Sequence, residues 1–249
     1  MPATLDARQA ILFDLDGTLV DTAADITAAV NRLMAELGTP GLPESVVRTM
    51  IGGGALLLVE RAFARQGVPL GERERLELMR RYLIHYADLL ESGTSTALPY
   101  PGAQRALSQL ADAGLPLAVV TNKEQRLAAR VLEETGLSRY VDLLVGGDGC
   151  WRRKPDPAML LHACAAFGVE PAAAVEVGDS VNDVLAARAA GMPVILVSYG
   201  YHGADDARRL GSDACVDSLT EVPGRIAVRA TGVAAGAEAR GRRRAPGTA

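Results

Sequence analysis

The sequence has little of what marks several large classes of protein. Its 249 residues include only three cysteines, without the paired spacing of a metal site, so reduced thiols are expected. The net charge of −4 argues against a nucleic-acid partner. No apolar run has the length of a membrane span, and the first residues lack the cationic-then-apolar order of a secretory signal. We therefore expect a cytoplasmic protein with neither a membrane nor a nucleic-acid partner.

What is present is an ordinary globular composition. Hydrophobic residues make up 49% of the chain, charged residues 22% and aromatic residues 4%. The length fits one large domain, or a domain that carries a smaller insert.

Short apolar runs alternate with segments of helical spacing through most of the chain. Such alternation predicts an α/β fold, a doubly wound parallel sheet with helices on both faces. The expected strands cover 10–13, 117–120, 143–145, 173–177 and 194–197. The expected helices between and after them cover 102–113, 125–135, 157–167 and 183–190.

One block interrupts this alternation. Helical spacing without strands is expected over 21–37, 44–50, 54–66 and 72–91, and a linker rich in Gly, Ser, Thr and Pro follows at 93–101. We therefore predict a discontinuous core domain made of residues 1–20 and 96–229, with an inserted helical cap domain at 21–95. The Ala-, Gly- and Arg-rich residues 230–249 lack periodicity and are predicted to be disordered.

Four polar clusters fall at the ends of predicted strands or in the loop after one. They are DLDGT at 14–18, TNK at 121–123, KPDP at 154–157 and GDSVND at 178–183. Ligands of doubly wound sheets bind beyond the carboxyl ends of the strands. One such cluster is a weak signal, but four at one edge predict a shared site.

Carboxylates dominate these clusters and indicate covalent phosphate chemistry. Asp14, at the end of a buried strand, is a candidate nucleophile that would form an acyl phosphate. Asp16 lies two residues later, so an extended backbone can aim it at the same cavity, where it could protonate the leaving oxygen and then activate water. Taken alone, Asp14 could instead cap the next turn, and Asp16 could be an ordinary Asp-Gly turn residue.

The other two acidic residues point to a cation. Asp179 brings a further carboxylate towards Asp14, and the mutual repulsion of such groups implies a hard ion, best matched by Mg²⁺. Asp183 either holds a metal-bound water or orients Lys154, although plain stabilisation of a helix N-terminus is also open.

Three residues suit the phosphate itself. Thr121 offers a hydroxyl, and Asn122 with the following backbone N–H groups can point at phosphate oxygens. Lys154 precedes Pro155, which favours an extended and stiff loop, so its ammonium can neutralise a phosphoryl group in transfer. An ordinary strand-end threonine and a solvated lysine are the alternatives for Thr121 and Lys154.

These motifs resemble the phosphatases of the haloacid dehalogenase superfamily. The matching segments, in order, are FDLDGTLVDT (13–22), VVTNK (119–123), KPDP (154–157) and VGDSVNDVLAARAAGMP (177–193), and the match covers about 10–220. The resemblance implies that Asp14 is the nucleophile, Asp16 the acid/base, and Thr121 and Lys154 the phosphate ligands. It further implies Mg²⁺ held by Asp14, the Asp16 backbone carbonyl and Asp179, and a helical cap formed by the insert.

Within that superfamily the chain looks most like the phosphoglycolate phosphatases. The similar segments include VDTAADITAAVNRL (20–33), VRTMIGGGALLLVERAF (47–63) and VSYGY (197–201), and the second belongs to the predicted cap. The resemblance implies a small phosphorylated metabolite, 2-phosphoglycolate, as substrate. Two departures could shift substrate preference: Glu124, where that subfamily commonly has Pro, and WRR at 151–153.

Other functions stay open at this point. The same fold serves other small-metabolite phosphatases and sugar-phosphate mutases, whereas a dehalogenase would leave Asp16 without a task. A phospho-accepting signalling module also combines acidic residues, Thr and Lys, but it is shorter and lacks the insert. Oligomeric state is undetermined, and four cations are equal candidates to bind a substrate carboxylate: Arg48, Arg61, Arg65 and Lys123.

Overall fold

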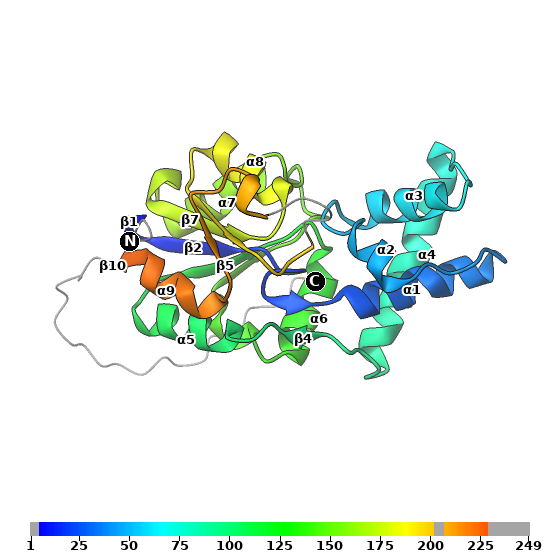
Figure 1. The fold of residues 1–249 in the computed structure, drawn as a ribbon, viewed down its shortest axis with the longest axis horizontal. Helices are drawn as coiled ribbons and strands as arrows, with labels where there is room; N and C mark the ends of the chain where they lie inside the picture. The colour runs from blue at the N-terminus through cyan, green and yellow to red at the C-terminus, as the bar shows by residue number, and fades with distance from the viewer. Residues whose placement is uncertain (1–4, 202–206, 229–249) are drawn as a thin grey trace, which may run out of the picture.

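The computed structural model describes residues 5–201 and 207–228, and its centre is a six-stranded parallel sheet (Figure 1). The strand order β6-β5-β2-β7-β8-β9 confirms the predicted doubly wound α/β fold. The strands are β2 (Ala10–Phe13), β5 (Leu117–Val120), β6 (Leu143–Val145), β7 (Ala174–Gly178), β8 (Val194–Val197) and β9 (Ala214–Val216). Of the six strands of this sheet, five were predicted from the sequence and β9 was not.

Helices cover both faces of the sheet because its central strands are apolar on both sides. In β2, Ala10 and Leu12 pack with the helices α7 and α8, whereas Ile11 and Phe13 face the opposite layer. The first layer is α7 (Ala158–Phe167) and α8 (Val181–Ala190). The second is α5 (Ala103–Asp112), α6 (Gln125–Glu134) and the short α9 (Val222–Arg225).

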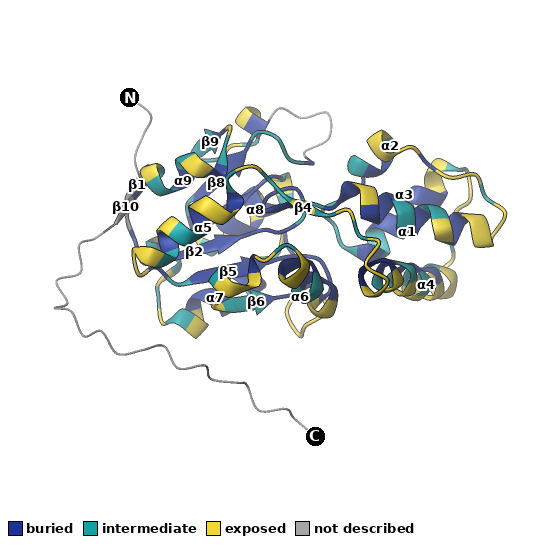
Figure 2. Ribbon diagram, turned by 90° about the horizontal axis from the view of Figure 1, so that it is seen from below, coloured by how far each residue is buried: buried dark blue, intermediate teal, exposed yellow. Residues whose placement is uncertain are grey.

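Four further helices lie to one side, beyond the carboxyl end of β2 (Figure 1). They are α1 (Ala23–Glu36), α2 (Glu44–Arg48), α3 (Ala55–Arg65) and α4 (Glu72–Glu91). Leu78, Tyr82 and Tyr86 recur every four residues in α4, so they share one buried face, against which α1 and α3 pack. Figure 2 shows the buried sides of these helices turned towards one another.

The two connections between the sheet and these helices pair with each other. The strands β3 (Val20–Asp21) and β4 (Leu98–Pro99) form a small antiparallel sheet. They lie beside the predicted boundaries at 20/21 and 95/96, and the division into a core and a cap domain stays a prediction. The predicted disordered tail at 230–249 lies outside the described residues.

The remaining elements are short. Strands β1 (Leu5–Arg8) and β10 (Ile226–Val228) form a separate parallel pair. Helix α8 begins at Val181, two residues earlier than predicted, with Ser180 as its N-cap, and the Asp183 carboxylate accepts from the Ser180 amide at 2.9 Å. Single 3₁₀ turns occur at Ser138–Tyr140, Pro171–Ala173, Ala207–Arg209 and Leu219–Glu221. Among the described helices, none is both long and apolar enough to cross a membrane.

Candidate active site

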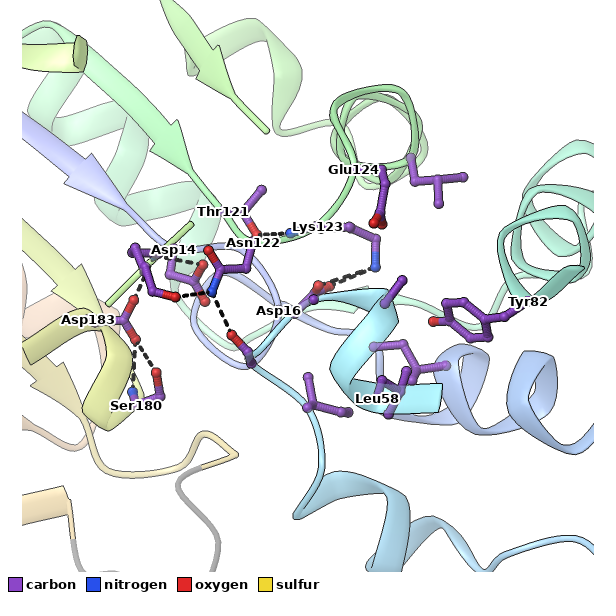
Figure 3. A pocket seen from close by; sticks show the side chains of 17 residues that line it. Asp14, Asp16, Leu58, Tyr82, Thr121, Asn122, Lys123, Glu124, Ser180 and Asp183 are labelled. Carbon is purple, nitrogen blue, oxygen red and sulfur yellow. Dashed lines mark hydrogen bonds and ion pairs between the residues drawn. The ribbon is translucent and has the colours of Figure 1, made fainter. Parts of the chain in front are cut away.

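The polar clusters meet at the carboxyl edge of the sheet (Figure 3). Asp14 follows β2, which lies between β5 and β7, and these neighbours lead into Thr121 and Asp179. Lys154 comes from the loop between β6 and α7. The site therefore forms because three adjacent parallel strands end at one level.

Asp14 and Lys154 make a buried ion pair at the centre of this edge. The Lys154 ammonium donates to Asp14 Oδ1 at 3.0 Å. Burial raises the pKa of Asp14 to about 7, although the Lys154 charge opposes the rise. For Lys154, burial alone would lower the pKa, but the surrounding carboxylates outweigh it and hold the pKa well above its usual range.

Lys154 has a third carboxylate partner that the motif analysis missed. Besides Asp14, its ammonium donates to Asp183 Oδ1 at 2.6 Å and to Glu176 Oε1 at 3.2 Å. Glu176 lies in β7 and is fully buried, which raises its pKa well above the usual range. A charged residue inside the apolar run AVEVG was the signal in the sequence that marked it.

Three carboxylates form a cluster that could hold a metal ion. Asp14, Asp179 and Asp183 each offer an oxygen within 4.8 Å of the others, and all three residues are buried. Burial raises the pKa of Asp179 well above its usual range. Oxygen ligands at this spacing, which are costly to ionise together without a counter-charge, fit a hard divalent cation.

Backbone donors hold two of these carboxylates in place. Asp179 Oδ2 accepts from the Tyr201 amide, and Asp183 Oδ2 accepts from the Ser180 amide at 2.9 Å and hydroxyl at 2.7 Å. Burial opposes ionisation of Asp183, but Lys154 and these Ser180 donors hold its pKa below the usual range. Gly17, at φ 90°, is required beside them, because a Cβ there would lie 2.5 Å from Asp179 Oδ2.

Asp16 faces away from this cluster and towards the helical insert. Its carboxylate accepts from the Thr22 hydroxyl at 2.7 Å. It also accepts from the Lys123 ammonium at 3.1 and 3.2 Å (Figure 3). The Lys123 ammonium also lies 4.1 Å from the centre of the Tyr86 ring in α4. The side chain of Asp16 thus lies on the side of the site that faces the helical insert, opposite the α8 side.

The two predicted phosphate ligands after β5 are also buried at this edge. Thr121 Oγ1 accepts from the Lys123 amide at 3.2 Å. Asn122 Nδ2 donates to the backbone oxygens of Gly52 and Lys154, both at 2.8 Å. Asn122 therefore ties the loop before α3 to the sheet edge, in addition to any contact with phosphate.

A cavity of about 40 Å³ lies between the sheet edge and the helices. Its lining from the sheet side includes Asp14, Asp16, Thr121, Lys154 and Asp183. Its lining from the helical side is mostly apolar, namely Ile26, Ile51, Gly52, Gly54, Ala55, Leu58 and Tyr82. Charged side chains at one end and apolar walls at the other suit a small anionic ligand.

The four cations that the sequence left as equal candidates to bind a substrate carboxylate differ in where the structure places them. Lys123 lines the cavity, and the three arginines are not among its lining residues. Arg48 instead pairs with Asp21 at 2.7 Å and with Glu44 at 2.9 Å, and Arg61 donates to the Met50 carbonyl.

The two departures from the resembled subfamily contact each other. Arg153 Nη2 lies 3.3 Å from Glu124 Oε1, and of the two only Glu124 is among the lining residues of the cavity. Gly54 in the loop that leads into α3, at φ 84°, leaves room for this arginine, since a Cβ there would lie 2.6 Å from Arg153 Nη1.

A buried carboxylate beside a fixed cation, a second carboxylate across the cavity and an acidic cluster are the groups that a phosphate-transferring hydrolase needs. The family comparison agrees: the model of the haloacid dehalogenase-like hydrolases matches residues 11–197. The chain belongs to this family, and it is an enzyme, a phosphatase.

Within this family, the chain is similar to the phosphoglycolate phosphatases of several bacteria. The plasmid phosphoglycolate phosphatase of Cupriavidus necator is 46% identical over 215 residues, covering 86% of this chain and 91% of that protein. That of Caulobacter vibrioides is 41% identical, covering 86% and 88%. The crystal structure of a predicted phosphoglycolate phosphatase from Haemophilus somnus 129PT has a TM-score of 0.80 and 31% identity, covering 87% and 97%.

Proposed function

We propose that this phosphatase hydrolyses 2-phosphoglycolate to glycolate and phosphate through a phosphorylated Asp14. The observation that carries the proposal is the Lys154–Asp14 contact of 3.0 Å at the centre of the sheet edge, with Asp16 across the same cavity. The similarity to phosphoglycolate phosphatases supports the substrate, and the sparse cysteines support a cytoplasmic location.

In the first step, an Asp14 carboxylate oxygen bonds to phosphorus while the bond from phosphorus to the substrate oxygen breaks. The departing alkoxide takes a proton from the Asp16 carboxyl and leaves as glycolate. Lys154, the Thr121 hydroxyl and the backbone amide of Asn122 stabilise the charge on the phosphoryl oxygens, because the Asn122 side-chain amide already donates to the Gly52 and Lys154 carbonyls. Asp183 and Glu176 position Lys154 through their contacts of 2.6 and 3.2 Å.

In the second step, Asp16 accepts a proton from water, whose oxygen bonds to phosphorus as the bond to Asp14 breaks. Phosphate leaves, and Asp16 is again protonated for the next cycle. The same side chain serves both steps because both the leaving and the attacking oxygen lie on its side of the phosphorus. The mostly apolar wall from the helical insert, which we propose acts as a cap domain at 21–95, limits the access of bulk water.

The acidic cluster fits Mg²⁺, which when bound would neutralise the carboxylates and polarise a phosphate oxygen. Asp14 and Asp179 would hold the ion with the Asp16 backbone carbonyl, and Asp183 would act from beside it. Burial raises the pKa of Asp179, and a bound cation would offset this cost of its charge.

We propose that Lys123 recognises the substrate carboxylate. It lines the cavity beside Asp16, and its position above the Tyr86 ring limits its freedom. A carboxylate close to the ester then adds an attractive contact that a hexose phosphate does not offer.

Substrate choice provides the first test of this function. In a panel of phosphate esters with Mg²⁺, we expect kcat/KM for 2-phosphoglycolate to exceed that of any hexose phosphate by at least about tenfold, or roughly 1.4 kcal/mol. Lys123→Met should remove most of this preference, whereas the matched Arg61→Met should keep it. A hexose phosphate or nucleotide that outperforms 2-phosphoglycolate refutes the assignment, and isomer formation without free phosphate would indicate a mutase.

Metal dependence provides the second test. Excess chelator should abolish phosphate release, added Mg²⁺ should restore it, and Ca²⁺ should inhibit because its larger, looser coordination shell misplaces the reacting groups. Asp179→Asn should raise the Mg²⁺ concentration needed for half-maximal activity by at least about tenfold, since one anionic ligand is lost. Full activity in chelator would remove the metal from the mechanism.

A further inference from the structure

Tyr201, in the loop after β8, contacts the junction between the sheet and the helical insert. Its side chain is almost fully buried. Its hydroxyl accepts from the backbone amides of Thr22 at 2.8 Å and Ala23 at 3.1 Å, and it donates to Asp21 Oδ1 at 2.5 Å. A side chain of the sheet domain therefore satisfies amides at the start of α1, the first helix of the insert.

A second helix of the insert is tied to the same place. Arg48, at the end of α2, donates to Asp21 Oδ2 at 2.7 Å. Its guanidinium also lies 5.0 Å from the centre of the Tyr201 ring. The hydroxyl and the ring of Tyr201 thus contact two helices that would have to move together if the insert changed its orientation.

The other side of Tyr201 contacts the reaction site. Its backbone amide donates to Asp179 Oδ2, in the acidic cluster. Its ring packs on the turn after Asp16, because a Cβ on Gly17 would lie 2.8 Å from Tyr201 Cδ2. One residue therefore lies against the acidic cluster, the turn after Asp16 and the start of α1.

Thr22 connects the hydroxyl of Tyr201 to Asp16. The Thr22 amide donates to Tyr201, and the Thr22 hydroxyl donates to Asp16 Oδ1 at 2.7 Å. The position of the Thr22 backbone decides where its hydroxyl lies, so the Tyr201 contact helps to fix the direction of the Asp16 carboxylate.

We propose that Tyr201 is a positioning residue that couples the orientation of the helical insert to the alignment of Asp16. Its hydroxyl sets the start of α1, and through Thr22 it aims the acid/base at the leaving oxygen. Its backbone amide independently supports Asp179. This inference rests on the proposed role of Asp16 in the reaction.

The test is Tyr201→Phe, which removes the hydroxyl and keeps both the ring and the backbone amide. We expect kcat/KM, which reports the steps up to the phosphoenzyme, to fall about tenfold on 2-phosphoglycolate and less than about threefold on nitrophenyl phosphate. The alkoxide needs the proton of a well-aligned Asp16, and nitrophenolate needs little help. Half-maximal activity should require the same Mg²⁺ concentration within about twofold, because the donor to Asp179 remains.

Tyr199→Phe is the matched control, because it removes a hydroxyl of the same loop that donates to the Thr18 carbonyl at 2.9 Å. It should change neither substrate by more than about twofold. Hydrogen exchange of the Thr22 and Ala23 amides should accelerate in Tyr201→Phe and not in Tyr199→Phe. Equal losses on both substrates, or equal effects of the two variants, would reduce Tyr201 to a general structural role and overturn the proposal.

Failure of the proposed function would look different. It would appear in the unsubstituted enzyme as absent hydrolysis of 2-phosphoglycolate, or in Asp16→Asn as a loss that does not depend on the leaving group. In the first case, the loss of kcat/KM in Tyr201→Phe is compared between nitrophenyl phosphate and the aliphatic ester of the panel that has the highest kcat/KM. In the second case, unchanged exchange of the Thr22 and Ala23 amides in Tyr201→Phe overturns the proposed coupling between Tyr201 and the helical insert. Faster exchange of these amides supports the contact of the Tyr201 hydroxyl with the start of α1.

Discussion

Replacing Asp14 by Asn is expected to lower turnover at least about a thousandfold and to leave the fold intact. The amide has the shape of the carboxylate but cannot form the acyl phosphate, so no first step takes place. The measurement is steady-state phosphate release from 2-phosphoglycolate at saturating Mg²⁺. No radiolabelled phosphate should be found on the protein.

Stability separates this chemical loss from a folding defect. Burial raises the pKa of Asp14 to about 7, so above its ordinary pKa the ionised carboxylate destabilises the folded state relative to the unfolded chain. A neutral amide removes that cost. In metal-free buffer near pH 8, the melting temperature of Asp14→Asn should equal or exceed that of the parent. The exposed Asp112→Asn is the matched control, and retention of a tenth or more of the activity by Asp14→Asn would refute the nucleophile.

Replacing Asp16 by Asn should produce a loss that depends on the leaving group. An aliphatic alkoxide leaves poorly and needs a proton in the transition state, whereas nitrophenolate does not. We expect kcat/KM to fall at least about a hundredfold on 2-phosphoglycolate and by less than about tenfold on nitrophenyl phosphate. Phosphate release gives the rate on 2-phosphoglycolate, and nitrophenolate absorbance gives the rate on nitrophenyl phosphate.

The same variant should separate the two chemical steps. If Asp16 also serves as base for water, as we propose, nitrophenyl phosphate should give a burst of nitrophenol followed by a slow steady rate, with phosphate trapped on Asp14 during the slow phase. Mass spectrometry of the quenched protein would detect the trapped phosphoenzyme. Equal losses on both substrates, without a burst or a trapped phosphoenzyme, would show that Asp16 is not the acid/base. The sizes of these losses need not add to those of Asp14 variants, because the two residues act in one reaction.

Several elements were too short for the sequence to reveal. Strands β3 and β4 have two residues each, β9 and β10 have three and β1 has four, too few to show a periodic pattern by themselves. These strands exist because a partner strand offers hydrogen bonds, and that partner is distant along the chain. Glu176 was missed for a related reason, since its role depends on its contact with Lys154. That residue is 22 positions away in the chain and comes within hydrogen-bond distance of Glu176 only after folding.

The order of strands and helices, the helical insert and the polar clusters at the strand ends could all be predicted from the amino-acid sequence. Each depends on local information: the period of apolar residues, the Gly and Pro turns, and the place of Asp14, Thr121 and Asp179 just after buried strands. Only the tertiary structure shows that Lys123 lines the cavity and that Arg48, Arg61 and Arg65 do not. Only the tertiary structure places Tyr201 between the acidic cluster and α1. Those outcomes depend on how the helices pack against the sheet edge, which sets side-chain directions between segments far apart in the chain.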